Sequence, residues 1–293
     1  MSRFRELLES GGFVVTGEVA PPRGADLAPM HVAVDLLSPY CHALNVTDNQ
    51  GATFRLSSLA ASRAILERGL EPIFQQTCRD RNRLALQSDL LAAWSLGLEN
   101  VLVVTGDDPR SGDHPDAKAV FDLDSTQLAA VVQGMNEGHD MIGRALPGGM
   151  NFYLGAAMFP EAEPWDAQLA RAEQKVAAGV RFFQTQAVFD MAKLERAVAA
   201  LRPLGVKVIA GVLVLKNPRV IDFVNAKLAG LEVPEEVADR IRSAQDPTAE
   251  AIKLATEQVR DIREIADGVH IMPLGLDAAV EHILGGEAAR LRW

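Results

Sequence analysis

Two carboxylates stand where they could do chemistry. Glu18 interrupts the apolar run Phe13–Val19, and Asp107 follows a second apolar run. A carboxyl group in apolar surroundings loses solvation, which favours its protonated form and lets it deliver a proton. Two structural alternatives stay open. Glu18 could pair with Arg23 or Arg79 and only close the structure, and Asp107 could cap the turn that follows it.

Four glutamines lie near the ends of two other apolar runs: Gln75, Gln76, Gln184 and Gln186. Each carboxamide offers a donor and an acceptor, which suits the edge of a pterin, flavin or purine ring. Taken singly, each would be an ordinary contact between strands. Four of them at neighbouring strand ends favour a heterocyclic ligand.

Three arginines, Arg79, Arg81 and Arg83, open a helical pattern after Thr77. The free N–H groups and the dipole at a helix N-terminus attract anions, so this segment predicts a phosphate site. The alternative is a solvated helix start. Metal binding is not expected, because the six histidines form no i,i+4 pair and have no nearby thiol.

Composition excludes several classes of protein. The 293 residues carry a formal net charge of -10, and an acidic chain is a poor partner for nucleic acid. No apolar run reaches the roughly 20 residues that span a bilayer, so no membrane segment is expected. The start of the chain has no signal-peptide core, and the two cysteines, Cys41 and Cys78, form no paired motif. A cytoplasmic, reducing location is therefore expected.

A short apolar run, a polar turn and an amphipathic stretch alternate along the chain. The runs are apolar on both faces, as buried parallel strands require. Their ranges are Phe13–Val19, His42–Thr47, Glu71–Thr77, Asn100–Thr105, Asn151–Ala157, Val180–Gln186, Val206–Val212 and Val269–Met272.

Amphipathic helices are expected between these strands. One presents Leu84, Leu90, Leu91 and Trp94 on its inner face. Two others are expected to begin at capping residues, Ser125 and Asp190.

Eight strands alternating with helices predict one α/β domain over residues 1–293, a closed (β/α)8 TIM barrel. An extra N-terminal helix and a helical insertion over Asn217–Asp267, before the last strand, are also expected. The alternative, an open doubly wound sheet, usually has a Gly-rich phosphate turn after its first strand, and none is present here. In a TIM barrel the carboxyl ends of the strands form the active site, so Glu18, Asp107 and the glutamines should meet there.

Several segments together resemble the methylenetetrahydrofolate reductase family, from about Gly12 to about Leu284. The resemblance is nearest to the branch that is fused to a homocysteine methyltransferase domain in some bacteria. It rests on Gly17–Arg23, Asn45–Asn49, Thr77–Asn82, Leu86–Leu91, Thr105–Pro109, Val120–Ser125, Gln184–Gln186 and Phe189–Asp190.

The resemblance implies a flavin-containing barrel of one-carbon metabolism and methionine biosynthesis. It interconverts 5,10-methylenetetrahydrofolate and 5-methyltetrahydrofolate with FAD as cofactor. By match, Glu18 resembles the general acid, Asp107 the carboxylate that stabilises the cationic iminium, and Gln186 an amide that contacts the folate. Residues matching flavin contacts are Thr47, Thr105, Gly106, Asp107 and, near the phosphates, Lys175.

Some positions depart from the enteric pattern of the family. Gln75 stands where that type has a histidine near the flavin, and Thr105 where it has an arginine. Gln168 and Gln174 replace an acidic and a basic FAD contact, and the last strand lacks the usual nearby arginine. Arg79, Arg81 or Arg83 could supply the lost phosphate contacts.

The expected activity is a flavin-dependent reduction of methylenetetrahydrofolate, with NADH, NADPH or a redox partner protein as electron donor. The resemblance also implies self-association into a homo-oligomer. A different class stays open, namely a folate- or pterin-binding partner subunit without redox activity of its own. The retained Glu18 and Asp107 favour the enzyme, because binding alone needs no such pair of acids.

Overall fold

A computed structural model describes residues 1–227 and 231–291 of the chain. Eight parallel strands form one closed barrel in the order β1 to β8, and β8 pairs with β1. An open doubly wound sheet is therefore excluded. The strands are β1 (Val14–Val19), β2 (Ala43–Val46), β3 (Pro72–Thr77), β4 (Asn100–Val104), β5 (Tyr153–Met158), β6 (Phe182–Ala187), β7 (Lys207–Leu213) and β8 (Gly268–Met272).

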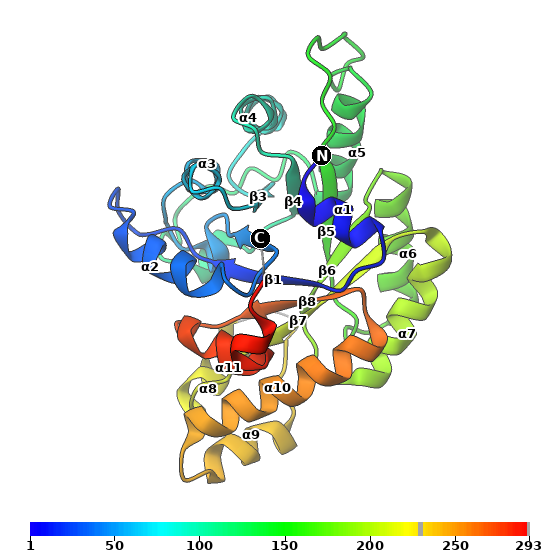
Figure 1. Ribbon diagram of the computed structural model, residues 1–293. Helices are drawn as coiled ribbons and strands as arrows, with labels where there is room; N and C mark the ends of the chain where they lie inside the picture. Colours follow the sequence, from blue (N-terminus) through cyan, green and yellow to red (C-terminus); the bar gives the residue numbers. More distant parts are fainter. Residues whose placement is uncertain (228–230, 292–293) are drawn as a thin grey trace.

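Each predicted strand is present, with ends within two residues of those expected. The expected N-terminal helix is also present, and the segment before β8 holds three helices. Figure 1 shows the other helices arranged around the barrel. The helices are α1 (Arg3–Glu9), α2 (Ala28–Leu37), α3 (Ser58–Glu67), α4 (Arg83–Ser95), α5 (Ser125–Asn136), α6 (Trp165–Ala177), α7 (Met191–Leu201), α8 (Pro218–Lys227), α9 (Glu235–Ser243), α10 (Pro247–Ile265) and α11 (Val280–Leu284).

Helix α1 lies across one end of the barrel, as Figure 1 shows. Its Phe4 and Leu8 are fully buried in a cluster with residues at the amino ends of the strands. The Phe4 ring lies 5.4 Å from that of Phe182, centroid to centroid, in an edge-to-face arrangement. Glu71 anchors the helix start by accepting hydrogen bonds from the backbone N–H groups of Arg3 and Phe4. The helix therefore closes the amino end, and ligands must enter from the carboxyl end.

Two details of the helices differ from expectation. The buried face of α4 carries Leu86, Leu90 and Ala93, whereas Leu84 is 75% exposed. Leu84 and Leu91 belong to the opposite stripe of the helix, because residues seven apart share a face. Helix α5 is capped by Asp124 rather than by Ser125, through a reciprocal capping box with Gln127. The expected cap of α7 at Asp190 is confirmed.

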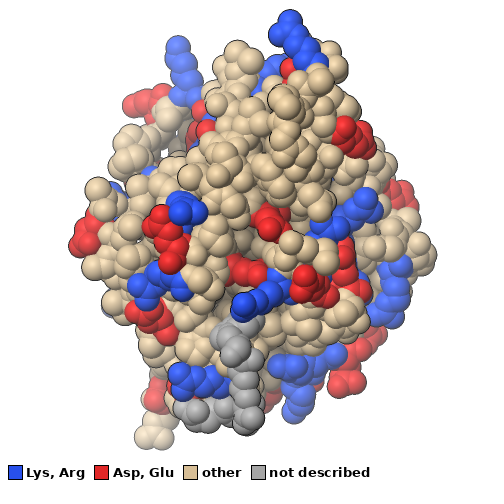
Figure 2. Space-filling view, turned by 45° about the horizontal axis from the view of Figure 1, so that its top comes forward, with Lys and Arg blue, Asp and Glu red and all other residues tan. Residues whose placement is uncertain are grey.

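Acidic and basic side chains are interspersed over the face drawn in Figure 2, without a broad basic stripe. Within residues 1–227 and 231–291, no helix has the length and apolarity that crossing a membrane would require.

The packing of α1 can be tested with Phe4→Ala. Removing a buried ring leaves a cavity, and such changes cost roughly 3–5 kcal/mol. We expect a clear fall in Tm and in the free energy of unfolding measured with urea. Leu84→Ala, an exposed leucine on α4, is the matched control and should change stability little. Equal effects of the two substitutions would contradict the role of α1 as the closure of the barrel.

Candidate active site

A cavity of about 260 Å³ opens at the carboxyl end of the barrel. Side chains from seven strands or the loops after them line it, and only β7 is not represented. It brings together many of the residues that the sequence singled out, which are Glu18, Gln75, Arg79, Thr105, Gly106, Asp107, Lys175, Gln184 and Gln186. Four others, Thr47, Gln76, Arg81 and Arg83, do not line it.

Glu18 lies near the top of β1 with its side chain 11% exposed. Its carboxylate accepts two long hydrogen bonds, 3.3 and 3.2 Å, from the Nε2 of Gln50. The suggested arginine partners are engaged elsewhere, since Arg23 pairs with Asp113 and Arg79 with Asp80. Among the described residues, Glu18 thus has no arginine partner and faces the cavity.

His270 lies beneath Glu18 and was not recognised as part of the site from the sequence. It is fully buried in the middle of β8, and its Nδ1 lies 2.9 Å from the Oγ1 of Thr16. Its Nε2 lies 3.8 Å from the Oε2 of Glu18 and has no hydrogen-bond partner in the described structure. A signal existed, because His270 and Glu18 both sit at inward positions of strands that become neighbours when the barrel closes.

Asp107 stands across the mouth from Glu18, in the loop after β4. Its Oδ2 accepts a hydrogen bond of 3.1 Å from the backbone N–H of Gly51. Gly106, just before it, has φ of +96°, and a Cβ there would lie 3.0 Å from the Cβ of Arg79. Only glycine fits this close approach easily. The backbone beside Asp107 is therefore pressed against Arg79.

Three amides form a chain across the floor of the cavity. Gln75 donates to the Oδ1 of Asn45 at 2.8 Å, and Asn45 in turn donates to Gln184. Gln186 lines the cavity one inward position above Gln184. Gln76 points outward and donates to the carbonyl of Leu86, so it lies outside the expected amide group. Alternation along a strand accounts for this separation of neighbours.

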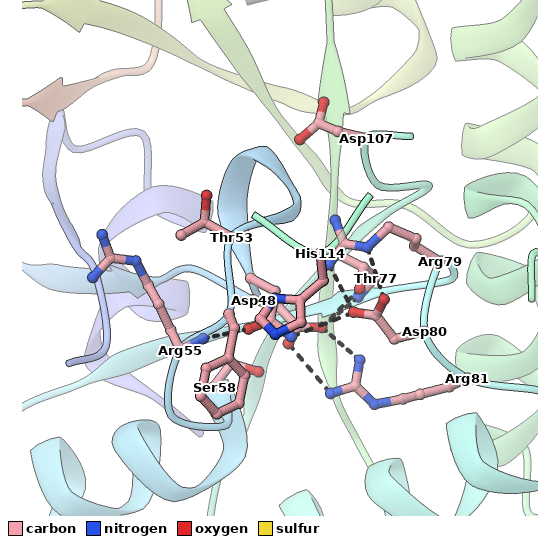
Figure 3. A network of polar contacts seen from close by, with 12 residues as sticks. Asp48, Thr53, Arg55, Ser58, Thr77, Arg79, Asp80, Arg81, Asp107 and His114 are labelled. Atoms are coloured by element: carbon pink, nitrogen blue, oxygen red, sulfur yellow. Dashed lines mark hydrogen bonds and ion pairs between the residues drawn. The ribbon is translucent and has the colours of Figure 1, made fainter. Parts of the chain in front are cut away.

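Arg81 differs from its expected role as a phosphate ligand. It forms ion pairs with Asp48 at 2.7 Å and with Asp89 at 2.8 Å, and it lines neither of the two cavities described here. Asp48, only 2% exposed, also accepts from the backbone and the hydroxyl of Thr77. These contacts, drawn in Figure 3, fasten the loop after β2 to the end of β3.

Arg79 keeps one donor unused. Its Nε and Nη2 donate to Asp80 at 2.8 and 2.7 Å, but its Nη1 is buried and has no partner in the described structure. The side chain is 2% exposed and lines the cavity. Figure 3 shows one guanidinium nitrogen directed away from Asp80, on the side of Asp107. A buried unpaired N–H is costly, so this group is suited to an acceptor atom of a ligand.

A second cavity, of about 410 Å³, adjoins the first along α6. The two share five lining residues, which are Thr105, Ser125, Ala157, Phe159 and Lys175. The cations of the second cavity are Arg171 and Lys175, and the amides of Gln168 and Gln174 lie beside them. Two cations and several amides suit the phosphates of a nucleotide. Arg171 was not recognised from the sequence, because an arginine inside a helix usually lies at the surface.

Lys175 is largely buried where the two cavities meet. Burial lowers the pKa of Lys175 to about 8, the charge of Asp124 opposes this shift, and Arg171 adds to it. Its Nζ donates to the carbonyl of Ala157 at 2.8 Å. Thr47, by contrast, is fully buried after β2, and its hydroxyl lines neither cavity and has no described partner.

A closed parallel barrel with carboxylates at the carboxyl ends of its strands has the architecture of a (β/α)8-barrel enzyme. A family model described as methylenetetrahydrofolate reductase matches residues 3–287. The chain therefore belongs to the methylenetetrahydrofolate reductase family, as its motifs indicated.

Two relatives are similar in sequence. A probable methylenetetrahydrofolate reductase (NADPH) of Caenorhabditis elegans is 24% identical over 78% of this chain. A 5,10-methylenetetrahydrofolate reductase of Pectobacterium carotovorum subsp. carotovorum is 27% identical over 71% of it. The matches span 34% and 66% of these relatives.

A solved structure shares the fold. It is a Clostridium thermocellum protein that binds two copies of 5-methyl-5,6,7,8-tetrahydrofolic acid. The TM-score is 0.65 with 11% identity, over 96% of this chain and 97% of that one. A 2,3-dimethylmalate lyase is also similar, with a TM-score of 0.52, 11% identity and coverage of 97% and 84% of the two chains.

The ion pair beneath the site can be tested with Asp48→Ala. Removing the carboxylate leaves part of the Arg81 guanidinium unpaired. It also leaves the backbone N–H and the hydroxyl of Thr77 without their acceptor. Because Arg81 is 16% exposed and keeps Asp89, we expect a loss of about 3 kcal/mol, the lower end for a broken buried pair. Urea unfolding measures it. Asp122→Ala breaks the ion pair with the exposed Arg83 and also removes the acceptor of its backbone N–H, so it should lower Tm less than Asp48→Ala does. A Tm that Asp48→Ala leaves unchanged would contradict the role of this network.

Proposed function

We propose that this chain reduces 5,10-methylenetetrahydrofolate to 5-methyltetrahydrofolate with a bound flavin, FAD, and can run the reaction in reverse. The observation that carries the proposal is the pairing of a largely buried Glu18 with Asp107 around one cavity. Family membership supports the same reaction. The fold neighbour that binds a methylated tetrahydrofolate supports the substrate class.

Glu18 acts as the proton donor in this proposal. The folate must be protonated on a ring nitrogen before its five-membered ring can open to an iminium cation. A carboxyl group at 11% exposure, among apolar strand residues and without an arginine partner, can hold a proton for that step. The buried His270 lies below it, with its Nε2 3.8 Å from a carboxylate oxygen of Glu18.

Asp107 stabilises the cation that results, and Gln186 contacts the folate. A fixed carboxylate lowers the energy of a positive intermediate most where water is excluded. The chain of amides from Gln75 to Gln184 offers further donors and acceptors for a pterin edge. None of these groups needs to move a hydride.

The residues present fit a flavin nucleotide. Lys175 and Arg171 would hold the phosphates in the cavity along α6, and Thr105 and Gly106 would lie against the ring system. The unused Nη1 of Arg79 would donate to a ligand oxygen, in place of a phosphate contact by Arg81. When bound, the flavin supplies the hydride. Thr47 would support the ring from below the cavity lining.

The electron donor in this proposal is NADH, NADPH or a redox partner protein, and the protein acts in the cytoplasm as a homo-oligomer. The chain would serve as a single barrel domain over residues 1–293. A second candidate is a folate-binding partner subunit without redox activity. The fold neighbour that binds two copies of 5-methyltetrahydrofolate favours it. Reduction of a bound flavin by candidate donors, followed by stopped-flow absorbance, separates the two.

Glu18→Gln tests the acid. The amide keeps the size and polarity of the side chain but cannot donate the required proton. We expect normal flavin content, read from absorbance near ~450 nm, and folate reduction slower by roughly 10²–10⁴-fold. Glu67→Gln, on the exposed side of α3, should behave as the wild type. Full activity of Glu18→Gln would refute the assignment.

The pKa of Lys175 predicts how flavin affinity depends on pH. An anion binds the protonated ammonium form, which the free protein keeps below about pH 8. We therefore expect affinity to be full below that pH and to fall by up to tenfold per unit above it. Fluorescence titration of flavin into apoprotein measures this. Lys175→Met should bind weakly at every pH and lose the pH dependence, whereas Lys253→Met, exposed on α10, should retain both. A profile of the wild type that stays flat through about pH 8 would contradict the role of Lys175.

A further inference from the structure

A short segment after β2 holds both carboxylates of the site at once. The Nε2 of Gln50 donates to the two carboxylate oxygens of Glu18 at 3.3 and 3.2 Å. The next residue, Gly51, donates its backbone N–H to Asp107 at 3.1 Å. Gln50 lines the same cavity as both acids. One turn of chain therefore bridges the mouth from one carboxylate to the other.

The backbone of this segment is strained. Asn49 and Ala52 have φ of 46° and 53°, values that residues with a side chain rarely adopt, and Gly51 between them has 61°. Such conformations persist only where surrounding contacts impose them. Here the surrounding contacts include the hydrogen bonds to the two acids, so the conformation of the segment is tied to them.

The ends of the segment are anchored, but its middle is open. The Oδ1 of Asn49 accepts from the backbone N–H of Arg55 at 2.9 Å. At the other end, the Ala52 carbonyl packs so closely on Gly112 that a Cβ on Gly112 would lie 1.9 Å from it. A Cβ on Gly51 would meet no atom within 4 Å. The space beside Gly51 is therefore open, and the Gln50 carbonyl accepts from the Thr53 N–H within the same turn at 3.2 Å.

These hydrogen bonds conflict with the chemistry of the site. A donor that points at a carboxylate favours its ionised form, and Glu18 must instead hold a proton. A donor on Asp107 reduces the negative charge that it can turn toward a cation. Gln50 also lines the cavity that would receive the ring. The hydrogen bonds that the two acids accept in the free protein must therefore break before the reaction can proceed.

We propose that Gln50–Gly51 is a latch that the bound pterin displaces, and that Gln50 is a positioning residue that frees Glu18 to hold its proton only when substrate is present. This inference rests on the proposed function and deepens it. In the free protein the latch keeps both carboxylates hydrogen-bonded. The incoming ring takes over its place, so that proton donation is coupled to substrate binding.

The other charged side chains that line the cavity are engaged with partners other than Glu18. Within the cavity, Asp48 is paired with Arg81, and Arg79 with Asp80. The remaining charged groups that line it are Asp107, held by Gly51, and Lys175, held by the Ala157 carbonyl. Beneath Glu18, His270 stays at 3.8 Å. The amide of Gln50 is the group whose removal should most directly change the protonation of the acid.

Gln50→Met keeps the length of the side chain and removes its donor. The profile of kcat/KM against pH reports the free enzyme, and that of kcat reports the substrate complex. We expect the limb of kcat/KM that falls with rising pH to move up by about 0.5–1 pH unit, because a lost hydrogen bond no longer favours the carboxylate. The same limb of kcat should not move, because Gln50 is already displaced in the complex.

Thr53→Val is the matched control. Its hydroxyl reaches only the Gly51 carbonyl, at 3.5 Å, and touches neither acid, so both profiles should stay as in the wild type. Equal shifts of kcat and kcat/KM in Gln50→Met would overturn the latch, as would no shift in either. If Gln50 had only a structural role, its substitution would shift both profiles equally or shift neither.

A second measurement needs neither a variant nor turnover. Hydrogen exchange of wild-type protein, with and without 5-methyltetrahydrofolate, reports on the Gly51 amide that now donates to Asp107. We expect exchange in a peptide over residues 49–53 to become faster when the folate binds, although ligands usually slow exchange. Slower or unchanged exchange would overturn the latch alone. Absence of any folate binding would overturn the proposed function, and the latch with it.

Discussion

Hydrogen bonding between β1 and β8 closes the sheet, and the rest of the structure depends on this closure. In the register of the pair, Thr16 lies opposite His270 and Gly17 opposite Ile271. A closed sheet has no edge, so every second side chain of each strand must point into the same narrow space. That requirement places Glu18 above His270, and it makes the amides of neighbouring strands contact one another. The amino end is filled by Phe4 and Leu8, which leaves the carboxyl end for ligands.

The loops after β2 and β4 line the cavity above the strands, and hydrogen bonds connect them. The backbone N–H of Phe54, after β2, donates to Asp113 in the loop after β4 at 2.9 Å, and Arg23 pairs with the same carboxylate. The base of the first loop is held by Asp48 and Arg81 (Figure 3). Between these supports, Gln50 and Gly51 are the part of the loop that touches the two acids. Rigid supports around one open segment let the site change locally without disturbing the barrel.

Much of this arrangement could be predicted from the sequence. Strands buried on both faces are uninterrupted apolar runs, so their ends were placed within two residues. Glu18 was identifiable because it interrupts such a run, and Asp107 because it follows one. The predicted details of helices were less accurate where several neighbouring residues could serve the same structural role. On α4 the apolar residues cover both stripes, and Leu84 and Leu91 were placed inside although they are exposed. At the start of α5, Asp124 and Ser125 are both good caps, and local pattern did not separate them.

The sequence by itself determined the alternation of strands and helices, the barrel class and the acids at its mouth, because these follow from local periodicity. Only the tertiary structure decided which charges and amides meet. Arg79 and Arg81 are two residues apart, yet one keeps a free donor in the cavity and the other is consumed by Asp48 and Asp89. His270 meets Thr16 across 254 residues, and Gln50 meets Glu18 across 32. Hydrogen bonds and ion pairs depend on distances of a few ångströms, which are set only when the ring of strands closes.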